Sequence, residues 1–162
     1  MDPKHAHYVA VTGIIVKDGK YLITKRSPNE IAFPNKWAAP GGKIELDDYI
    51  KKKKTTDKQW YNVCEDVLRR EVMEEAGLLI KNIRDLTNLT FIRADNIPVV
   101  VISLFADWAE GEVKLNEEAT EYAWVDIEEA KNYDFMEGIY SELVMVDKVL
   151  KGNSVEKWSK KF

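Results

Sequence analysis

Hydrophobic and polar residues follow each other along this chain in a pattern that mixes strands with helices. Residues 7–16 and 21–25 are apolar-rich stretches on either side of a turn at Gly19, which predicts a β-hairpin. Residues 97–108 form a nearly continuous apolar run, typical of a central strand that is covered on both faces. Shorter strands are predicted at residues 89–92 and 121–125.

Helical spacing predicts one long helix in the middle of the chain, from about Asp57 to Ala76. Thr56 and Gln59 match a capping box at its start, and Gly77 is a natural residue to end it in the left-handed conformation. Two more helices are predicted, at residues 126–131 and 136–150. Strands and helices therefore alternate, which indicates an α/β fold with helices available for both faces of one sheet.

Composition narrows the class of protein. The chain has 162 residues, 45% of them hydrophobic and 32% charged, which is typical of one globular domain. The net charge of −4 disfavours nonspecific binding to nucleic acid or to a membrane surface. The single cysteine, Cys64, excludes an intramolecular disulfide and a multi-cysteine zinc site. The longest apolar run is too short to span a bilayer, so we expect a cytoplasmic protein.

Three carboxylates share one face of the long predicted helix. At about 100° per residue, Glu74 and Glu75 lie within about 60° of Glu71. Apolar residues precede them on the same stripe, so this face looks inward. Carboxylates placed there repel one another and lose solvation unless a cation joins them. A divalent cation with oxygen ligands meets this need; an exposed acidic helix end paired with Arg70 is the alternative.

A family resemblance strengthens the first interpretation. Residues 70–78, read with Gly42, resemble the Nudix signature G-x5-E-x7-R-E-U-x-E-E-x-G-U, in which U is a bulky aliphatic residue. Residues 37–45 and 115–125 are also similar to the family, so the resemblance covers about residues 7–130. It implies a Nudix-type α/β/α sandwich, with a mixed β-sheet and helices on both faces.

Two features depart from that signature. Asp48 stands where the family has glutamate, and residues 49–69 fill 21 positions where the pattern has seven. We interpret the excess as an insertion at about residues 49–62 within a single Nudix hydrolase domain, residues 1–162. The polar residues 47–57 are expected to form a solvated loop. Aspartate is shorter than glutamate, so Asp48 is expected to reach a metal only through water.

The resemblance implies metal-dependent hydrolysis of the pyrophosphate bond of a nucleoside di- or triphosphate derivative by water. It implies Glu71, Glu74 and Glu75 as metal ligands, with a backbone carbonyl at Gly42 as a further one. Arg70 is expected to hold the carboxylates in place. Ligands that are all oxygen favour Mg²⁺ or Mn²⁺ over zinc. The expected partner is a nucleotide or nucleotide derivative, without nucleic acid or membrane, and a homodimer is an assembly that the sequence permits.

The general base is left open by the resemblance, since Glu71, Glu75 and Glu118 all qualify. Glu118 matches the family's later loop position best, with Glu121 as the alternative there. We therefore predict that the catalytic group consists of Arg70, Glu71, Glu74, Glu75 and Glu118.

Three further questions stay open at this point. The departure at Asp48 and the insertion motivate an alternative function, a non-catalytic nucleotide sensor on the same fold. Arg26 is a candidate contact for a phosphate, with an ordinary surface arginine as the alternative. Aromatic candidates for stacking on a base are Phe33, Trp37, Tyr133 and Phe135.

Overall fold

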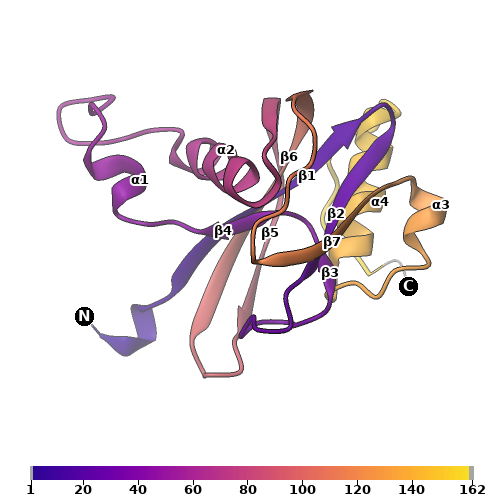
Figure 1. The fold of residues 1–162 in the computed structure, drawn as a ribbon. Coiled ribbons are helices and arrows are strands. Elements are labelled where there is room, and N and C mark those ends of the chain that lie inside the picture. Colours follow the sequence, from indigo (N-terminus) through magenta and orange to yellow (C-terminus); the bar gives the residue numbers. More distant parts are fainter. Residues whose placement is uncertain (1, 161–162) are drawn as a thin grey trace.

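A seven-stranded mixed sheet lies between helices in the computed structural model, which describes residues 2–160 (Figure 1). The strands are β1 (Tyr8–Lys17), β2 (Lys20–Arg26), β3 (Trp37–Ala38), β4 (Gly41–Lys43), β5 (Leu79–Ile92), β6 (Pro98–Glu110) and β7 (Ala119–Val125). The helices are α1 (Asp47–Ile50), α2 (Val63–Ala76), α3 (Ile127–Ala130) and α4 (Ile139–Leu150), with a short 3₁₀ turn, η1 (Pro3–His5), before β1.

Two parallel strands form the middle of the sheet. The strand order is β3-β2-β1-β6-β5, with β4 paired to β1 and β7 paired to β2. Strands β1 and β6 run parallel, from Tyr8 opposite Val99 to Val16 opposite Asp107. The other pairings between these strands are antiparallel. The α/β fold and the central position of the apolar run at residues 97–108 are therefore confirmed.

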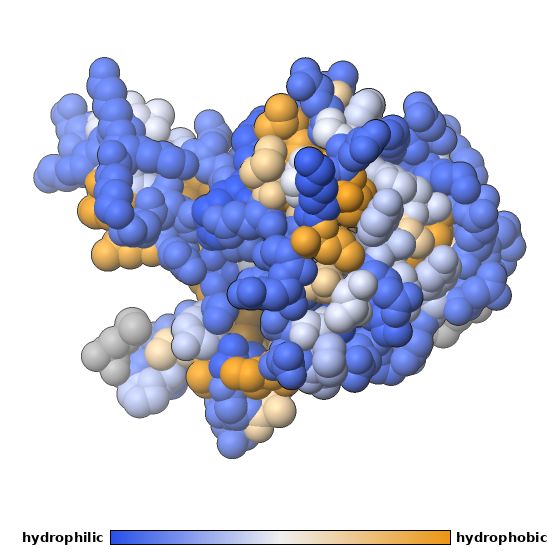
Figure 2. Space-filling view, viewed as in Figure 1, coloured by the Kyte–Doolittle hydropathy of each residue, from blue (hydrophilic) through white to orange (hydrophobic). Residues whose placement is uncertain are grey.

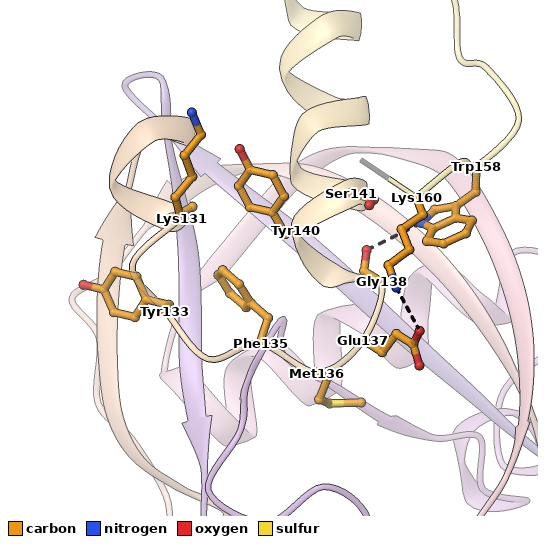
Figure 3. A pocket seen from close by; sticks show the side chains of 11 residues that line it. Lys131, Tyr133, Phe135, Met136, Glu137, Gly138, Tyr140, Ser141, Trp158 and Lys160 are labelled. Atoms are coloured by element: carbon orange, nitrogen blue, oxygen red, sulfur yellow. Dashed lines mark hydrogen bonds and ion pairs between the residues drawn. The ribbon is translucent and has the colours of Figure 1, made fainter. Parts of the chain in front are cut away.

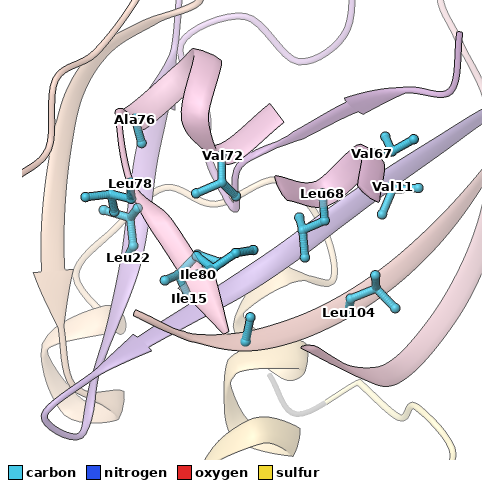
Figure 4. Close-up of a cluster of buried hydrophobic side chains, with 11 residues drawn as sticks. Val11, Ile15, Leu22, Val67, Leu68, Val72, Ala76, Leu78, Ile80 and Leu104 are labelled. Atoms are coloured by element: carbon cyan, nitrogen blue, oxygen red, sulfur yellow. The ribbon is translucent and has the colours of Figure 1, made fainter. Parts of the chain in front are cut away.

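Alternation along β1 divides the core into two layers. Val11 and Ile15 belong to the cluster under α2, whereas Ile14 belongs to the cluster under α4. Figure 4 shows the first cluster, in which side chains of α2 point down onto the strands. Gly13 lets this helix come close, because a Cβ there would lie 2.5 Å from Leu68 Cδ1. Each fully buried aliphatic side chain contributes about 1.5–3 kcal/mol of transfer free energy.

The long helix begins later than the sequence predicts. It starts at Val63 rather than Asp57, because Asn62 adopts a left-handed conformation at φ 60° and interrupts any earlier turn. The capping pair does interact, since Gln59 N donates to Thr56 Oγ1 at 3.1 Å, but it closes a turn outside the helix. The predicted helix start was therefore wrong, although the end at Gly77 was right.

Residues 51–62 fold back on α1 instead of extending the helix. The ring of Trp60 lies 5.3 Å from that of Tyr49, and its Nε1 donates to Lys52 O at 3.0 Å. These contacts give the helical residues Asp47–Ile50 a partner, which corrects the solvated loop expected at residues 47–57 for its first four positions, whereas residues 51–57 are exposed as expected. In Figure 1 this part of the chain projects to one side of the sheet.

Strand β5 is longer than its predicted piece at residues 89–92, because it begins at Leu79. Its pairing with β6 shifts register at three places, which breaks the simple apolar–polar alternation that would have revealed it.

Helix α4 begins at Ile139, three residues after the predicted start. Within residues 2–160, no helix is both long enough and apolar enough to cross a bilayer.

Candidate active site

Helix α2 presents two of its glutamates to the interior. Glu71 and Glu75 are each only 7% exposed, whereas Glu74 points to solvent. Glu71 and Glu75 are one turn apart on the side of the helix that also carries the buried Val72 and Leu68, so packing of the helix onto the sheet buries both carboxylates.

The loop before β7 brings a third carboxylate to this place. The last carbonyls of a helix have no partner within it, and here two of them bond to the loop: Lys114 N donates to Ala76 O at 2.9 Å and Asn116 N donates to Glu75 O at 3.2 Å. The Asn116 side chain accepts a hydrogen bond from Glu118 N at 3.0 Å. This loop therefore places Glu118 beside the end of α2.

Glu71, Glu75 and Glu118 form a cluster in which one oxygen of each carboxylate lies within 4.8 Å of the others. Burial, then the negative charges of Glu118 and Glu71, raise the pKa of Glu75 well above its usual value. Burial also raises the pKa of Glu71, although Arg70 opposes the shift. Three converging carboxylates are a donor set that fits a hard divalent cation such as Mg²⁺ or Mn²⁺, which would relieve this repulsion.

Two glycines close the cluster from the side of β4. A Cβ at Gly42 would lie 2.3 Å from Glu71 Oε1, so no side chain fits at this position. Gly41 N donates to Glu75 Oε1 at 3.4 Å, and a Cβ on Gly41 would meet Val11 O at 2.2 Å. The backbone of Gly41 and Gly42 therefore lies in close contact with the carboxylates of Glu71 and Glu75. A backbone carbonyl that serves as a metal ligand would need this proximity.

Arg70 connects the acidic residues on the outer side. Its guanidinium donates to Glu71 Oε1 at 2.6 Å, to Glu74 Oε2 at 3.1 Å and to Lys43 O at 3.1 Å. Glu74 takes no part in the three-carboxylate cluster and reaches it only through this arginine. Arg70 therefore fixes the orientation of the carboxylates by charge-assisted hydrogen bonds.

Asp48 supports Arg70 from behind. It is 8% exposed, and its two oxygens accept from Arg70 Nε at 2.6 Å and Arg70 Nη2 at 3.0 Å. Glu45 N donates to the second oxygen at 2.7 Å. Burial alone would raise the pKa of Asp48, but these bonds outweigh it and hold the pKa below its usual value. Asp48 lies outside the glutamate cluster. It orients Arg70, which in turn bonds to Glu71 of the cluster.

A cleft of about 380 Å³ opens in front of these groups. In Figure 2 the surface is hollowed between the hydrophilic lobe that contains α1 and the tip of the β5–β6 hairpin. Arg26 lines the cleft, with its guanidinium bonded to Glu30 and to Ala32 O, both at 2.8 Å. Phe33 also lines it and packs against Phe91 with ring centroids 5.4 Å apart.

The other aromatic candidates lie elsewhere. Trp37 packs edge-on against Tyr133 at 4.8 Å, and Tyr133 lies 6.2 Å from Phe135. Tyr133 and Phe135 line a separate cavity of about 650 Å³ next to Trp158 (Figure 3). This cavity is larger than the cleft but contains none of the clustered carboxylates, so the chemistry belongs to the cleft.

Sequence reasoning missed several residues of the cleft. Tyr8, Phe91 and Arg93 line it from the start of β1 and the end of β5. The guanidinium of Arg93 lies 5.3 Å and the ammonium of Lys43 5.1 Å from the centroid of the Tyr8 ring. No local pattern marks these residues, because only strand pairing brings them together.

Comparison with known proteins agrees with this geometry. Residues 6–143 match the model of the NUDIX domain. This chain belongs to the Nudix hydrolase family. The nucleoside triphosphatase NudI of Escherichia coli is 34% identical over 134 residues, which cover 76% of this chain and 85% of that protein. The Nudix hydrolase class predicted from the sequence is therefore confirmed.

Solved structures show the same fold. A MutT Nudix hydrolase from Burkholderia pseudomallei superposes with a TM-score of 0.69 at 21% identity, covering 88% of this chain and 99% of that one. A MutT protein from Methanosarcina mazei gives a TM-score of 0.65 at 22% identity, covering 91% of this chain and 96% of that one. The Nudix-type sandwich predicted from the sequence is confirmed.

Proposed function

We propose that this Nudix hydrolase cleaves a pyrophosphate bond of a nucleoside triphosphate, with Mg²⁺ or Mn²⁺ bound at the glutamate cluster. The observation that carries the proposal is the convergence of Glu71, Glu75 and Glu118 at the cleft. The name of the related nucleoside triphosphatase NudI supports the choice of a triphosphate.

The roles we assign follow from burial and reach. We assign Glu71 and Glu75 to the metal from α2. We keep Glu74, which lies outside the three-carboxylate cluster and accepts from Arg70, as a further metal ligand from the solvent side. The ion, when bound, neutralises phosphate charge and lowers the pKa of a bound water. Glu118 is the exposed member of the cluster, so we assign it, rather than Glu71 or Glu75, to take a proton from the attacking water.

Positive side chains in the cleft match an anionic substrate. The chain as a whole is acidic, so attraction of a triphosphate must be local. Lys43, Arg26 and Arg93 all line the cleft, where Arg26 is paired with Glu30 and Arg93 with Asp95. We assign them to the phosphates and assign Phe33 and Phe91 to the wall of the cleft beside the base.

The remaining sequence predictions are kept as proposals. We treat residues 1–162 as one Nudix domain with an insertion at about residues 49–62, an interpretation supported by the single seven-stranded sheet. None of residues 49–62 lines the cleft, so we assign the insertion no part in substrate binding. A cytoplasmic location and a homodimer stay predictions.

A substrate panel tests the proposed function. The purified protein is incubated with Mg²⁺ or Mn²⁺ and the common ribo- and deoxyribonucleoside triphosphates, with nucleotide diphosphate derivatives for comparison, and products are identified by mass. We expect turnover of at least one triphosphate and none in EDTA. Tight nucleotide binding without any release of phosphate or pyrophosphate would instead support the non-catalytic sensor.

A further inference from the structure

Glu118 stays in the glutamate cluster against electrostatic repulsion. One oxygen of its exposed carboxylate lies within 4.8 Å of an oxygen of Glu71 and of Glu75. Burial is the main cause of the raised pKa values of Glu71 and Glu75, and the charge of Glu118 adds to both. An exposed carboxylate that is repelled in this way gains by turning into water, where its charge is screened. Bonds to the main chain of Glu118 can supply the restraint that its side chain lacks.

Both main-chain polar groups of Glu118 are bonded. Its amide donates to Asn116 Oδ1 at 3.0 Å, and its carbonyl accepts from Ser27 N at 2.8 Å. The amide of Asn116 donates to Glu75 O at 3.2 Å, at the end of α2. Glu118 is therefore fixed on one side to α2 and on the other side to the segment that follows β2.

The second of these anchors belongs to a segment that reaches the cleft. Ser27 is 5% exposed, and a turn is built on it: its Oγ accepts from Asn29 N at 3.2 Å, and its carbonyl accepts from Glu30 N at 3.2 Å. The carboxylate of Glu30 in turn accepts from the guanidinium of Arg26 at 2.8 Å, and Arg26 lines the cleft. The turn therefore connects Glu118 with a residue that we assign to the substrate.

We propose that Ser27 and Asn116 are positioning residues for Glu118, so that the segment that contacts the substrate phosphates also places the proton acceptor. The proposal rests on the proposed function, in which Glu118 takes a proton from the attacking water and Arg26 contacts a phosphate. Neither Ser27 nor Asn116 is among the described residues that line the cleft, so an effect of either on turnover passes through another residue. Proton transfer needs the acceptor within hydrogen-bonding reach of the water, so a small displacement of Glu118 lowers kcat.

Asn116→Ala removes the bond to the Glu118 amide and keeps the main-chain bond to Glu75. We expect kcat to fall about tenfold, because misplacing a reacting group by a small distance is costly, while KM for the nucleotide stays within about twofold. Asn116→Asp keeps an oxygen acceptor at the same position and should restore most of kcat. The control is Asn132→Ala, which also removes an exposed asparagine side chain bonded to the main chain and should leave kcat unchanged.

A double-mutant cycle shows whether the effect passes through Glu118. Glu118→Gln alone should lower kcat about 100-fold, a usual contribution of a general base. Ser27→Ala removes the acceptor for Asn29 N, loosens the turn and should lower kcat about threefold in the otherwise wild-type protein. In the Glu118→Gln background, Asn116→Ala and Ser27→Ala should each change kcat by less than about twofold, because no proton acceptor is left to misplace.

Amide hydrogen exchange tests the anchoring of Glu118 without any turnover. In the metal-free protein the amide of Glu118 should exchange at least about tenfold more slowly than the same amide in Asn116→Ala, because Asn116 Oδ1 accepts from it. Asn132→Ala should leave this exchange rate unchanged. Thermal unfolding verifies that each variant is folded.

The outcomes are distinct. A kcat within about twofold of wild type in Asn116→Ala would overturn the positioning role of Asn116, and the same result in Ser27→Ala would overturn that of Ser27. Losses that simply add in the Glu118→Gln background would overturn the role of Glu118 as the residue they act through. Absence of turnover for every nucleotide would instead refute the proposed function. The exchange rates would then still decide the anchoring, because equal rates in the wild type and Asn116→Ala would reject it.

Discussion

Replacing Glu75 by glutamine should make the metal-free protein more stable and the enzyme nearly inactive. Glu75 is 7% exposed and faces Glu71 and Glu118, with carboxylate oxygens within 4.8 Å. Two charges at that distance repel by on the order of 3 kcal/mol at an effective dielectric constant of about 20. The protein relieves part of this by protonation and solvent screens Glu118, so we expect a net gain of about 2 kcal/mol. Glutamine keeps the acceptor for Gly41 N and adds a donor for the neighbouring carboxylates.

The sign of the pH dependence follows from the raised pKa. Because folding raises the pKa of Glu75, the wild-type protein loses stability as pH rises above the pKa of an unfolded glutamate toward the folded value. The advantage of Glu75→Gln should therefore be small near pH 5 and larger at pH 8. For a domain of this size about 2 kcal/mol corresponds to roughly 4–8 °C in Tm. Thermal unfolding in EDTA at both pH values measures it.

Glu75→Gln should weaken metal binding and lower kcat, although it stabilises the metal-free protein. Saturating Mg²⁺ at about 100 times Kd should stabilise the wild-type protein by about 2.7 kcal/mol and the variant far less. The variant should lose at least about 100-fold in kcat, about 2.7 kcal/mol of transition-state stabilisation. Glu112→Gln, an exposed change of the same kind, serves as the control. A variant with a near-normal kcat, or one less stable than wild type in EDTA at pH 8, would refute a metal site at this cluster.

Three further changes test the surroundings of the cluster. Glu74→Gln should lower kcat about 100-fold with little effect on Tm, because Glu74 is exposed; near-normal turnover would remove it from the metal site. Arg70→Lys should cost about 1–2 kcal/mol of stability in urea unfolding and reduce kcat, since an ammonium cannot replace the two bonds to Asp48; unchanged values would contradict this positioning role. Gly42→Ala should lower kcat more than about tenfold while the fold persists, because its Cβ displaces Glu71. Steady-state kinetics measure kcat and circular dichroism checks the fold; an unchanged kcat would contradict the close contact between Gly42 and Glu71.

Some of the site could be predicted from the sequence because it depends on local geometry. The spacing of Glu71, Glu74 and Glu75 fixes their angles around a helix whatever the rest of the chain does. The same is true of the turn at Gly19 and of the left-handed end at Gly77, which has φ 68°. The apolar run of β6 likewise required a central strand, since no exposed strand would carry it.

The helix start shows where local reasoning stops. Thr56 and Gln59 make the predicted hydrogen bond, yet the helix begins only at Val63 and Trp60 packs against Tyr49. A capping pattern predicts only which local hydrogen bonds a segment can form by itself. The contact between Tyr49 and Trp60 joins residues near the two ends of the inserted segment, so their packing is decided only in three dimensions.

By itself the sequence determined the family and predicted an inward acidic helix face, which holds for Glu71 and Glu75 but not for the exposed Glu74. Tertiary structure decided which carboxylates actually meet: it left Glu74 outside, brought Glu118 in through a loop bonded to the end of α2, and gave Asp48 to Arg70. The reason is that periodicity places side chains only relative to their own element. Distances between elements depend on strand pairing and on hydrogen bonds between residues far apart in the chain, which no local spacing encodes.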